Sequence, residues 1–209
     1  MDDLFPGLTD EERRGLQLSQ DPKRVRARLG SYERKLQKEK EQYGFYRDGA
    51  GRRYHVGPHY MLLGENDGAL KAFRWFEEEF PDNISEPAHT LCWSLALHRS
   101  GNEVTAARKL RQAMLSNLYL VPHLIGSPIA RLDIWHGSNL EDITYLDYIQ
   151  DAYLELWTQG EREWAASLYH SEGFQKVRAR YIEIGRLLDA TPPGPERSRL
   201  VKEKRGLGG

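Results

Sequence analysis

Residues 93–113 read WSLALHRSGNEVTAARKLRQA. Large apolar residues recur every three or four positions on both sides of Gly101, which is the spacing of amphipathic helices. A glycine between two such runs predicts a tight turn, because glycine adopts a positive φ at little steric cost. The stretch therefore predicts two antiparallel helices joined at Gly101.

The same pattern occurs at two other places in the chain. In each, a glycine has a large apolar residue four positions before it, an alanine five positions after it and a large apolar residue nine positions after it. The three sets are Tyr60, Gly64, Ala69 and Phe73; Leu97, Gly101, Ala106 and Leu110; and Leu156, Gly160, Ala165 and Tyr169. We expect each alanine where the paired helices approach most closely, since a larger side chain would push them apart.

This register resembles the tetratricopeptide repeat family, whose repeats of about 34 residues each pair two antiparallel helices. The resemblance covers about half of the chain and places repeats at about 50–83, 87–120 and 146–179. It implies an all-α fold of antiparallel hairpins stacked as an α-solenoid. The glycines lie 37 and then 59 positions apart. An insertion, residues 121–145, therefore interrupts the stack before the third repeat.

The segment before the repeats is expected to be helical and then to turn. Residues 1–42 predict an N-terminal helical extension, with Thr9 as a helix cap and a second helix that begins after Asp21-Pro22. Residues 43–57 follow, where aromatic residues flank Asp48-Gly49. This favours a short β-hairpin near 43–56, with an ordered loop as the alternative.

The repeat domain is expected to span residues 58–190. Apolar residues spaced by three and four predict an amphipathic helix over 174–189, placed to cap the open end of the stack. The Pro- and Gly-rich stretch that follows ends the folded part, so residues 191–209 are expected to form a flexible basic tail.

Bulk composition indicates a well-hydrated globular protein, with 39% hydrophobic residues, 29% charged residues and a net charge of −1. Cys92 is the only cysteine, so no intramolecular disulfide or thiolate metal cluster can form within the chain. The acidic start, MDDLFP, does not resemble a signal peptide, and no stretch approaches the ~18 apolar residues of a membrane span. We expect a cytoplasmic protein without a membrane partner.

A stack of such repeats implies a concave groove lined by the first helix of each pair. Family members that hold chaperone C-terminal carboxylates carry Lys, Arg and Asn there, whereas these positions are mostly apolar. The residues expected to bind a partner are Leu91, Leu95, His98, Arg99, Gln150, Leu154 and Trp157. A partner helix or extended peptide would lie in this groove. The alternative is that the insertion or the N-terminal helices cover it.

Residues 22–42 are strongly basic, with eight Lys or Arg and three Glu. They suggest an alternative function, that of a nucleic-acid-associated accessory protein that uses this segment and the C-terminal tail. The candidate contacts are Lys23, Arg24, Arg26, Arg28, Arg34 and Lys35. The segment also carries one apolar stripe, so its charges equally fit the solvated face of a docked helix.

Catalytic and metal-binding motifs give little support for an enzyme. His55 and His59 stand four apart, but Gly57-Pro58 between them is expected to break the helix that would align them. Trp135 and His136 in the insertion are the other weak candidates, and the chain has no phosphate-binding loop. We therefore predict a non-enzymatic protein–protein interaction scaffold or adaptor, with no cofactor and no metal.

Overall fold

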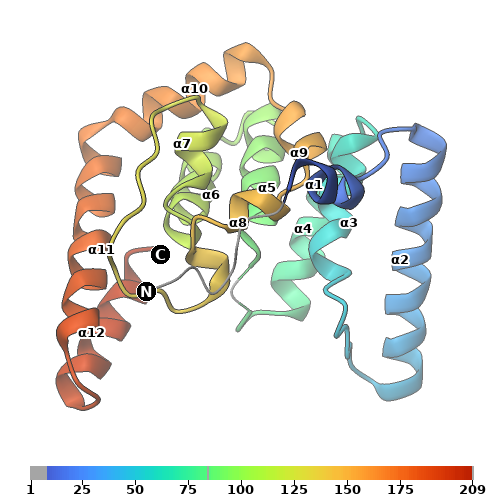
Figure 1. Cartoon of the computed structure of the whole chain (residues 1–209). Coiled ribbons are helices and arrows are strands. Elements are labelled where there is room, and N and C mark those ends of the chain that lie inside the picture. The colour runs from blue at the N-terminus through green and yellow to red at the C-terminus, as the bar shows by residue number, and fades with distance from the viewer. Residues whose placement is uncertain (1–8, 84, 209) are drawn as a thin grey trace.

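The computed structural model describes residues 9–83 and 85–208, except for the side chains of residues 10, 13 and 16. Within these residues the chain is helical and contains no strand, which confirms the all-α prediction. The longer helices are α2 (Pro22–Tyr43), α3 (Arg53–Leu62), α4 (Asn66–Glu79), α5 (Pro87–Arg99), α6 (Glu103–Ser116), α10 (Gln159–His170), α11 (Glu172–Ala190) and α12 (Pro195–Gly206). Figure 1 shows α2 at one end of the molecule, α11 and α12 at the other, and α3 to α6 between them.

Short elements connect the longer helices. They are α1 (Asp10–Leu16), α7 (Leu120–Leu124), the 3₁₀ turn η1 (Asn139–Glu141), α8 (Tyr145–Tyr148) and α9 (Asp151–Glu155). Thr9 caps α1 through a capping box with Glu12, as the sequence predicts. No helix in the described part of the chain is both long enough and apolar enough to cross a bilayer.

Two helical hairpins, α3–α4 and α5–α6, form the centre of the fold. Gly64 and Gly101 occupy the turns with φ of 72° and 78°, values that favour glycine. Ala69 and Ala106 are completely buried, and so are Phe73 and Leu110, one turn further along each second helix. In the first two sets, the glycine therefore lies in a turn, and the alanine and the apolar residue are buried, as expected.

The third set folds differently. Gly160 is the second residue of α10 and lies in no turn, because a capping box between Thr158 and Glu161 begins the helix at Gln159. The residues before it form the short helices α8 and α9 in place of one long first helix. The expectation of a third hairpin that turns at Gly160 is wrong, although Ala165 is buried as expected.

The β-hairpin expected near residues 43–56 is absent, and the alternative of an ordered loop is correct. Asp48 is buried, and its carboxylate accepts hydrogen bonds from the backbone N–H groups of Arg52 (2.8 Å) and Arg53 (2.9 Å). These donors belong to the first turn of α3, where helices have unpaired N–H groups. Asp48 therefore anchors the start of a helix, and Asp48-Gly49 is not a strand-to-strand turn.

Helix α3 continues through Gly57-Pro58, contrary to expectation. Gly57 is needed there for packing, because a Cβ at this position would lie 2.4 Å from the ring of Phe73 on α4. The close contact between α3 and α4 supports the helix although Pro58 cannot donate a backbone hydrogen bond. His55 and His59 consequently share one helix, with their ring centroids 6.0 Å apart.

The C-terminal residues form a docked helix, where a flexible tail was expected. Leu200 on α12 is buried against Ile184 and Leu188 of α11. Arg180 of α11 and Glu203 of α12 form an ion pair at 2.7 Å. The segment docks although it is basic, because its apolar side contacts α11 and only the rest of the helix faces solvent.

The insertion forms an ordered bridge between the central hairpins and α11. After α7 it runs in extended form along α11, where the N–H of Trp135 donates to the carbonyl of Gly185 at 3.2 Å. It then returns to α6, where buried Asn117 donates to the carbonyls of Leu140 (2.8 Å) and Asp142 (3.0 Å). The insertion thereby carries the chain back over α5.

Candidate binding pocket

The apolar residues expected to line an open groove are buried in the core of the protein. Leu91 and Leu95 are fully buried, while Leu154 is 9% and Trp157 3% exposed. The end of the insertion and the segments that follow it cover this side of α5. For example, the hydroxyl of Tyr145 accepts a hydrogen bond from the N–H of Ala88 at 3.1 Å. The chain itself fills the groove, as in the alternative interpretation, although residues after the insertion contribute to the cover together with the insertion.

The polar members of the predicted groove also bind the chain itself. His98 stacks on Trp164, with ring centroids 4.2 Å apart. Arg99 forms an ion pair with Glu161 at 2.7 Å. Gln150 accepts a hydrogen bond from the N–H of Leu18 at 2.7 Å. His98, Arg99 and Gln150 therefore hold segments of the chain together.

A different hollow is the best candidate for a binding site. It has a volume of about 780 Å³ and lies among the ends of α4, α5 and α6, the insertion and the C-terminal helices. Its aromatic lining residues are Phe76, Phe80, Trp93, Trp135 and Tyr181. Pockets that hold small ligands or peptide side chains have volumes of about 300–1,000 Å³. The hollow, which we call the central pocket, therefore has a suitable size and lining.

Lys109 stands in one wall of the central pocket. It is buried, with its Nζ 3.4 Å from the ring centroid of Trp93 and 3.1 Å from Oε1 of Glu77. Burial lowers the pKa of Lys109, while the hydrogen bond with Glu77 raises it. The ammonium is thus held between an aromatic face and one carboxylate.

Lys204 has a similar environment in another part of the wall. Its Nζ lies 2.7 Å from Oε2 of Glu141, 4.5 Å from the ring centroid of Tyr181 and 5.0 Å from that of Trp135. Lys204 is buried, and it joins α12 to the insertion and to α11. Docking of α12 therefore completes this wall of the pocket.

A serine–histidine pair lies beside the pocket, and its imidazole is buried. The Oγ of Ser85 is 2.6 Å from Nδ1 of His89, while Nε2 of His89 is buried and has no hydrogen-bond partner among the described residues. Burial lowers the pKa of His89 to about 3. A general base needs a pKa near the working pH and a group that orients it. His89 meets neither requirement.

The other candidate groups for chemistry are dispersed or buried. The Nδ1 of His59 donates a hydrogen bond to the backbone oxygen of His55 (2.8 Å) and lies 3.4 Å from the hydroxyl of Tyr153, and burial lowers the pKa of His59 to about 4. His136 is on the insertion, with its Nε2 4.0 Å from Asp142. Cys92 is fully buried, and burial raises its thiol pKa. The described residues contain no group of three or more His, Cys, Asp or Glu arranged to hold a metal ion.

Most of the basic residues proposed to contact nucleic acid are exposed on α2. Lys23, Arg24, Arg28, Arg34 and Lys35 face solvent, whereas Arg26 forms an ion pair with Glu65. The basic C-terminal residues belong to α12, at the end of the molecule opposite to α2 (Figure 1). The two basic segments therefore do not form one surface.

The sequence reasoning missed both lysines of the central pocket. Lys109 lies on the second helix of its hairpin, and Lys204 lies in the segment expected to be flexible. A partial signal was present, because Leu200 and Lys204 are spaced as one face of a helix that starts after Pro195. Comparisons with protein-family models, with curated proteins and with solved structures find no match for this chain.

Proposed function

We propose that this chain is a non-enzymatic protein-interaction scaffold with tetratricopeptide-like hairpins, and that a segment of a partner protein binds in the central pocket. The proposal depends mainly on one observation, the aromatic lining of a hollow of about 780 Å³. Exposed apolar surface of this kind is costly in water and is typical of binding sites.

The chemistry of the lining indicates the kind of segment that would fit. Phe76, Phe80 and Trp93 offer rings to an apolar or aromatic side chain of the partner. Gln112, Ser116 and Ser138 offer polar groups to its backbone. The cations and carboxylates of the lining balance in number, with Lys109, Lys204 and Arg205 against Glu77, Asp82 and Glu141. We therefore propose a short peptide segment anchored by an apolar or aromatic side chain.

The non-enzymatic part of the proposal rests on the state of the reactive groups. Ser85 lines the pocket and contacts His89, and the low pKa of His89 makes it a poor base for this serine. Cys92 and His59 are buried away from the pocket. We therefore propose that the pocket binds its partner segment through shape and apolar contact.

Peptide selection with a pocket-filling variant tests this function. Ser116→Phe places a ring in the pocket from α6, and Ser167→Phe places the same ring on an exposed position of α10 as a matched control. Peptides enriched from a random library on the wild type should bind Ser116→Phe at least about tenfold more weakly, a loss of about 1.4 kcal/mol. They should bind Ser167→Phe as well as the wild type. Enriched peptides that bind both variants equally would exclude the central pocket as the site.

A further inference from the structure

We propose that the exposed basic side of α2, together with the aromatic pair that follows it, binds single-stranded nucleic acid. This surface is separate from the central pocket and does not depend on the function proposed for it. We call it the α2 face. It consists of Lys23, Arg24, Arg28, Arg34, Lys35, Lys38, Tyr43, Phe45 and Arg47.

Helix α2 is attached to the rest of the chain by other residues. Val25, Leu29 and Leu36 are buried and form its contact stripe. Arg26 pairs with Glu65, and Lys40 pairs with Glu79 at 2.7 Å. The cations of the α2 face are therefore not needed to dock the helix.

The cations of the α2 face outnumber the acidic side chains beside them. Glu33 accepts a hydrogen bond from the hydroxyl of Tyr60 at 2.6 Å, and Glu39 pairs with Arg52 at 3.2 Å. Two of the three glutamates of α2 thus contact the body of the protein. Among the described residues, the only ion pair made by the seven cations of the face is between Arg24 and Asp21, at 3.8 Å and largely exposed.

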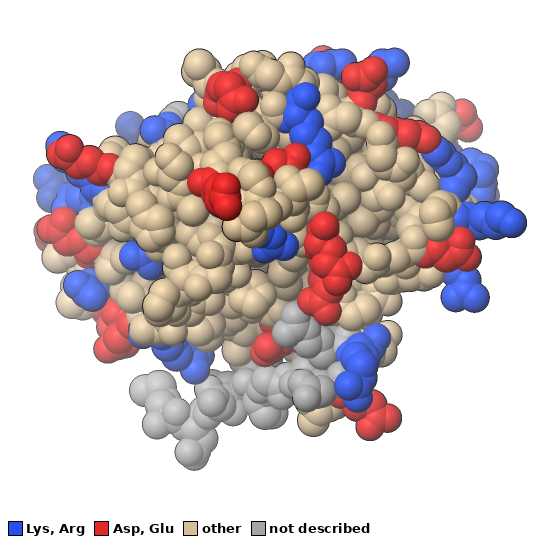
Figure 2. Space-filling model, turned by 90° about the horizontal axis from the view of Figure 1, so that it is seen from above, with Lys and Arg blue, Asp and Glu red and all other residues tan. Residues whose placement is uncertain are grey.

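This arrangement leaves a strip of six Lys and Arg side chains on one side of α2, with Glu41 beside Arg34 and Lys38 near its C-terminal end. Figure 2 shows several Lys and Arg side chains, with some Asp and Glu between them, at the edge formed by α2. The strip from Lys23 to Lys38 extends about 22 Å along the helix, at about 1.5 Å per residue. An anionic polymer is the ligand class that such a strip attracts, because each neutralised phosphate releases a counterion.

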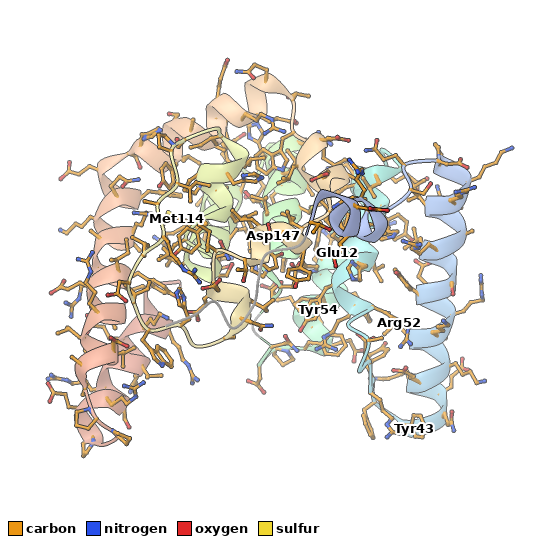
Figure 3. The ribbon with its side chains drawn as sticks, viewed as in Figure 1. Glu12, Tyr43, Arg52, Tyr54, Met114 and Asp147 are labelled. Carbon is orange, nitrogen blue, oxygen red and sulfur yellow. The ribbon has the colours of Figure 1, made fainter. Side chains whose placement is uncertain are left out.

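Two exposed aromatic rings distinguish a nucleic acid from other polyanions. Helix α2 ends at Gly44, whose φ of 76° turns the chain so that the rings of Tyr43 and Phe45 lie 6.2 Å apart. Tyr43 is 41% and Phe45 59% exposed, and the guanidinium of Arg47 lies 5.0 Å from the Tyr43 ring. Figure 3 shows Tyr43 at the far end of α2. Proteins that bind single strands combine such rings, on which bases stack, with a basic track for the phosphates.

Along the helix axis, the rings lie within about three turns of the nearest cations of α2. Lys38 precedes Tyr43 by five residues, which corresponds to about 8 Å along the helix axis. Arg34 and Lys35 lie one turn further back. A short strand can therefore stack a base on Phe45 while its phosphates follow these three side chains. Duplex nucleic acid keeps its bases stacked internally and cannot use the rings.

Fluorescence anisotropy with a labelled oligouridylate of about 12 nucleotides tests the proposal. The wild type should bind at about 20 mM salt and weaken steeply as salt rises. The triple variant Arg34→Gln, Lys35→Gln, Lys38→Gln should bind at least tenfold more weakly, with a salt slope smaller by about 2. The matched control Arg186→Gln, Arg199→Gln, Lys202→Gln removes the same charge from exposed positions of α11 and α12 and should bind like the wild type.

A second variant tests the aromatic part. Phe45→Ala should weaken binding about fivefold or more with an unchanged salt slope, and Phe45→Trp should restore it. Absence of wild-type binding at low salt would overturn the proposal, and so would equal losses in the two triple variants. Tighter binding to a duplex of equal length, or to anionic phospholipid vesicles in place of the oligonucleotide, would also overturn it.

Discussion

The ammonium of Lys109 lies 3.4 Å from the ring centroid of Trp93, and both residues are buried in the wall of the central pocket. Trp93 in turn stacks on Phe73, with centroids 5.4 Å apart and ring planes within 5°. The ammonium on this stack loses much of its hydration, and contacts with Glu77 and the indole replace the lost water. The pair thus joins the hairpin core to the pocket lining.

Replacement of this lysine by an apolar side chain of similar length should change stability little. For Lys109→Met we expect the free energy of unfolding to change by less than about 1 kcal/mol, because removal of the desolvation cost offsets the loss of the ion pair. Lys109→Ala should cost about 2 kcal/mol or more, because it also removes the buried stem. Urea unfolding measures both, and equal losses in the two variants would show that the charge itself stabilises the fold.

The two hairpin glycines and Gly160 should respond in opposite ways to alanine. At Gly64 and Gly101 the positive φ should make each substitution cost about 1–2 kcal/mol. Gly160 lies in the first turn of α10 with no atom within 4 Å of an added Cβ, so Gly160→Ala should be neutral or stabilise by up to about 1 kcal/mol. Thermal and urea unfolding of the three variants check this. A loss at Gly160 as large as at Gly101 would contradict the assignment of Gly160 to a helix.

Buried histidines should make the protein sensitive to acid. Burial lowers the pKa of His59 to about 4 and that of His89 to about 3, from an ordinary value of 6.5. Both are neutral in the folded protein, so the unfolded chain binds more protons below pH 6.5. Their contribution to stability is complete above pH 6.5 and is lost as the pH falls through 4 and 3. The shift at His59 alone corresponds to about 3 kcal/mol.

Glu86 acts in the opposite direction. Burial raises its pKa from 4.5 to about 7, so its contribution is complete below pH 4.5 and is lost as the pH rises to 7. Glu86→Gln keeps an acceptor for the N–H of His89, which now bonds to the carboxylate at 2.8 Å, and cannot ionise. The variant should therefore gain stability relative to the wild type from pH 4.5 to 7. Urea unfolding across this range measures the difference, and a constant difference would contradict the assigned pKa.

Docking of α12 should depend on Leu200. This side chain is 5% exposed between α11 and α12, and Leu200→Ala should weaken the local contact by about 2 kcal/mol or more. Trypsin cleavage at Arg197, Arg199 or Lys202 should then become about 30-fold faster, because cleavage follows the population of the open form. Ser198→Ala, on the exposed side of the same helix, is the control. Unchanged cleavage of Leu200→Ala would show that other contacts hold α12.

Local features of the sequence predict much of the fold. The hairpins at Gly64 and Gly101 follow from the helical spacing of the apolar residues and from glycines placed where the turn needs a positive φ. The third glycine misled the prediction because Thr158 and Glu161, which are equally local, start a helix at that point. The hairpin predicted at Asp48-Gly49 failed because the Asp48 carboxylate binds the N–H groups of α3, a contact that a turn signal does not reveal.

The sequence by itself determined that this protein is built of helices and where its two central hairpins turn, because periodicity and glycine conformation act over a few residues. Only the tertiary structure decided which apolar side chains fill the core and which line a hollow. Residues 121–157 return over α5 and bury Leu91 and Leu95, whereas the aromatic residues around Lys109 remain beside a hollow. The physical reason is that burial depends on which distant segments pack together, and hydrophobic contact has no directional signature in the sequence.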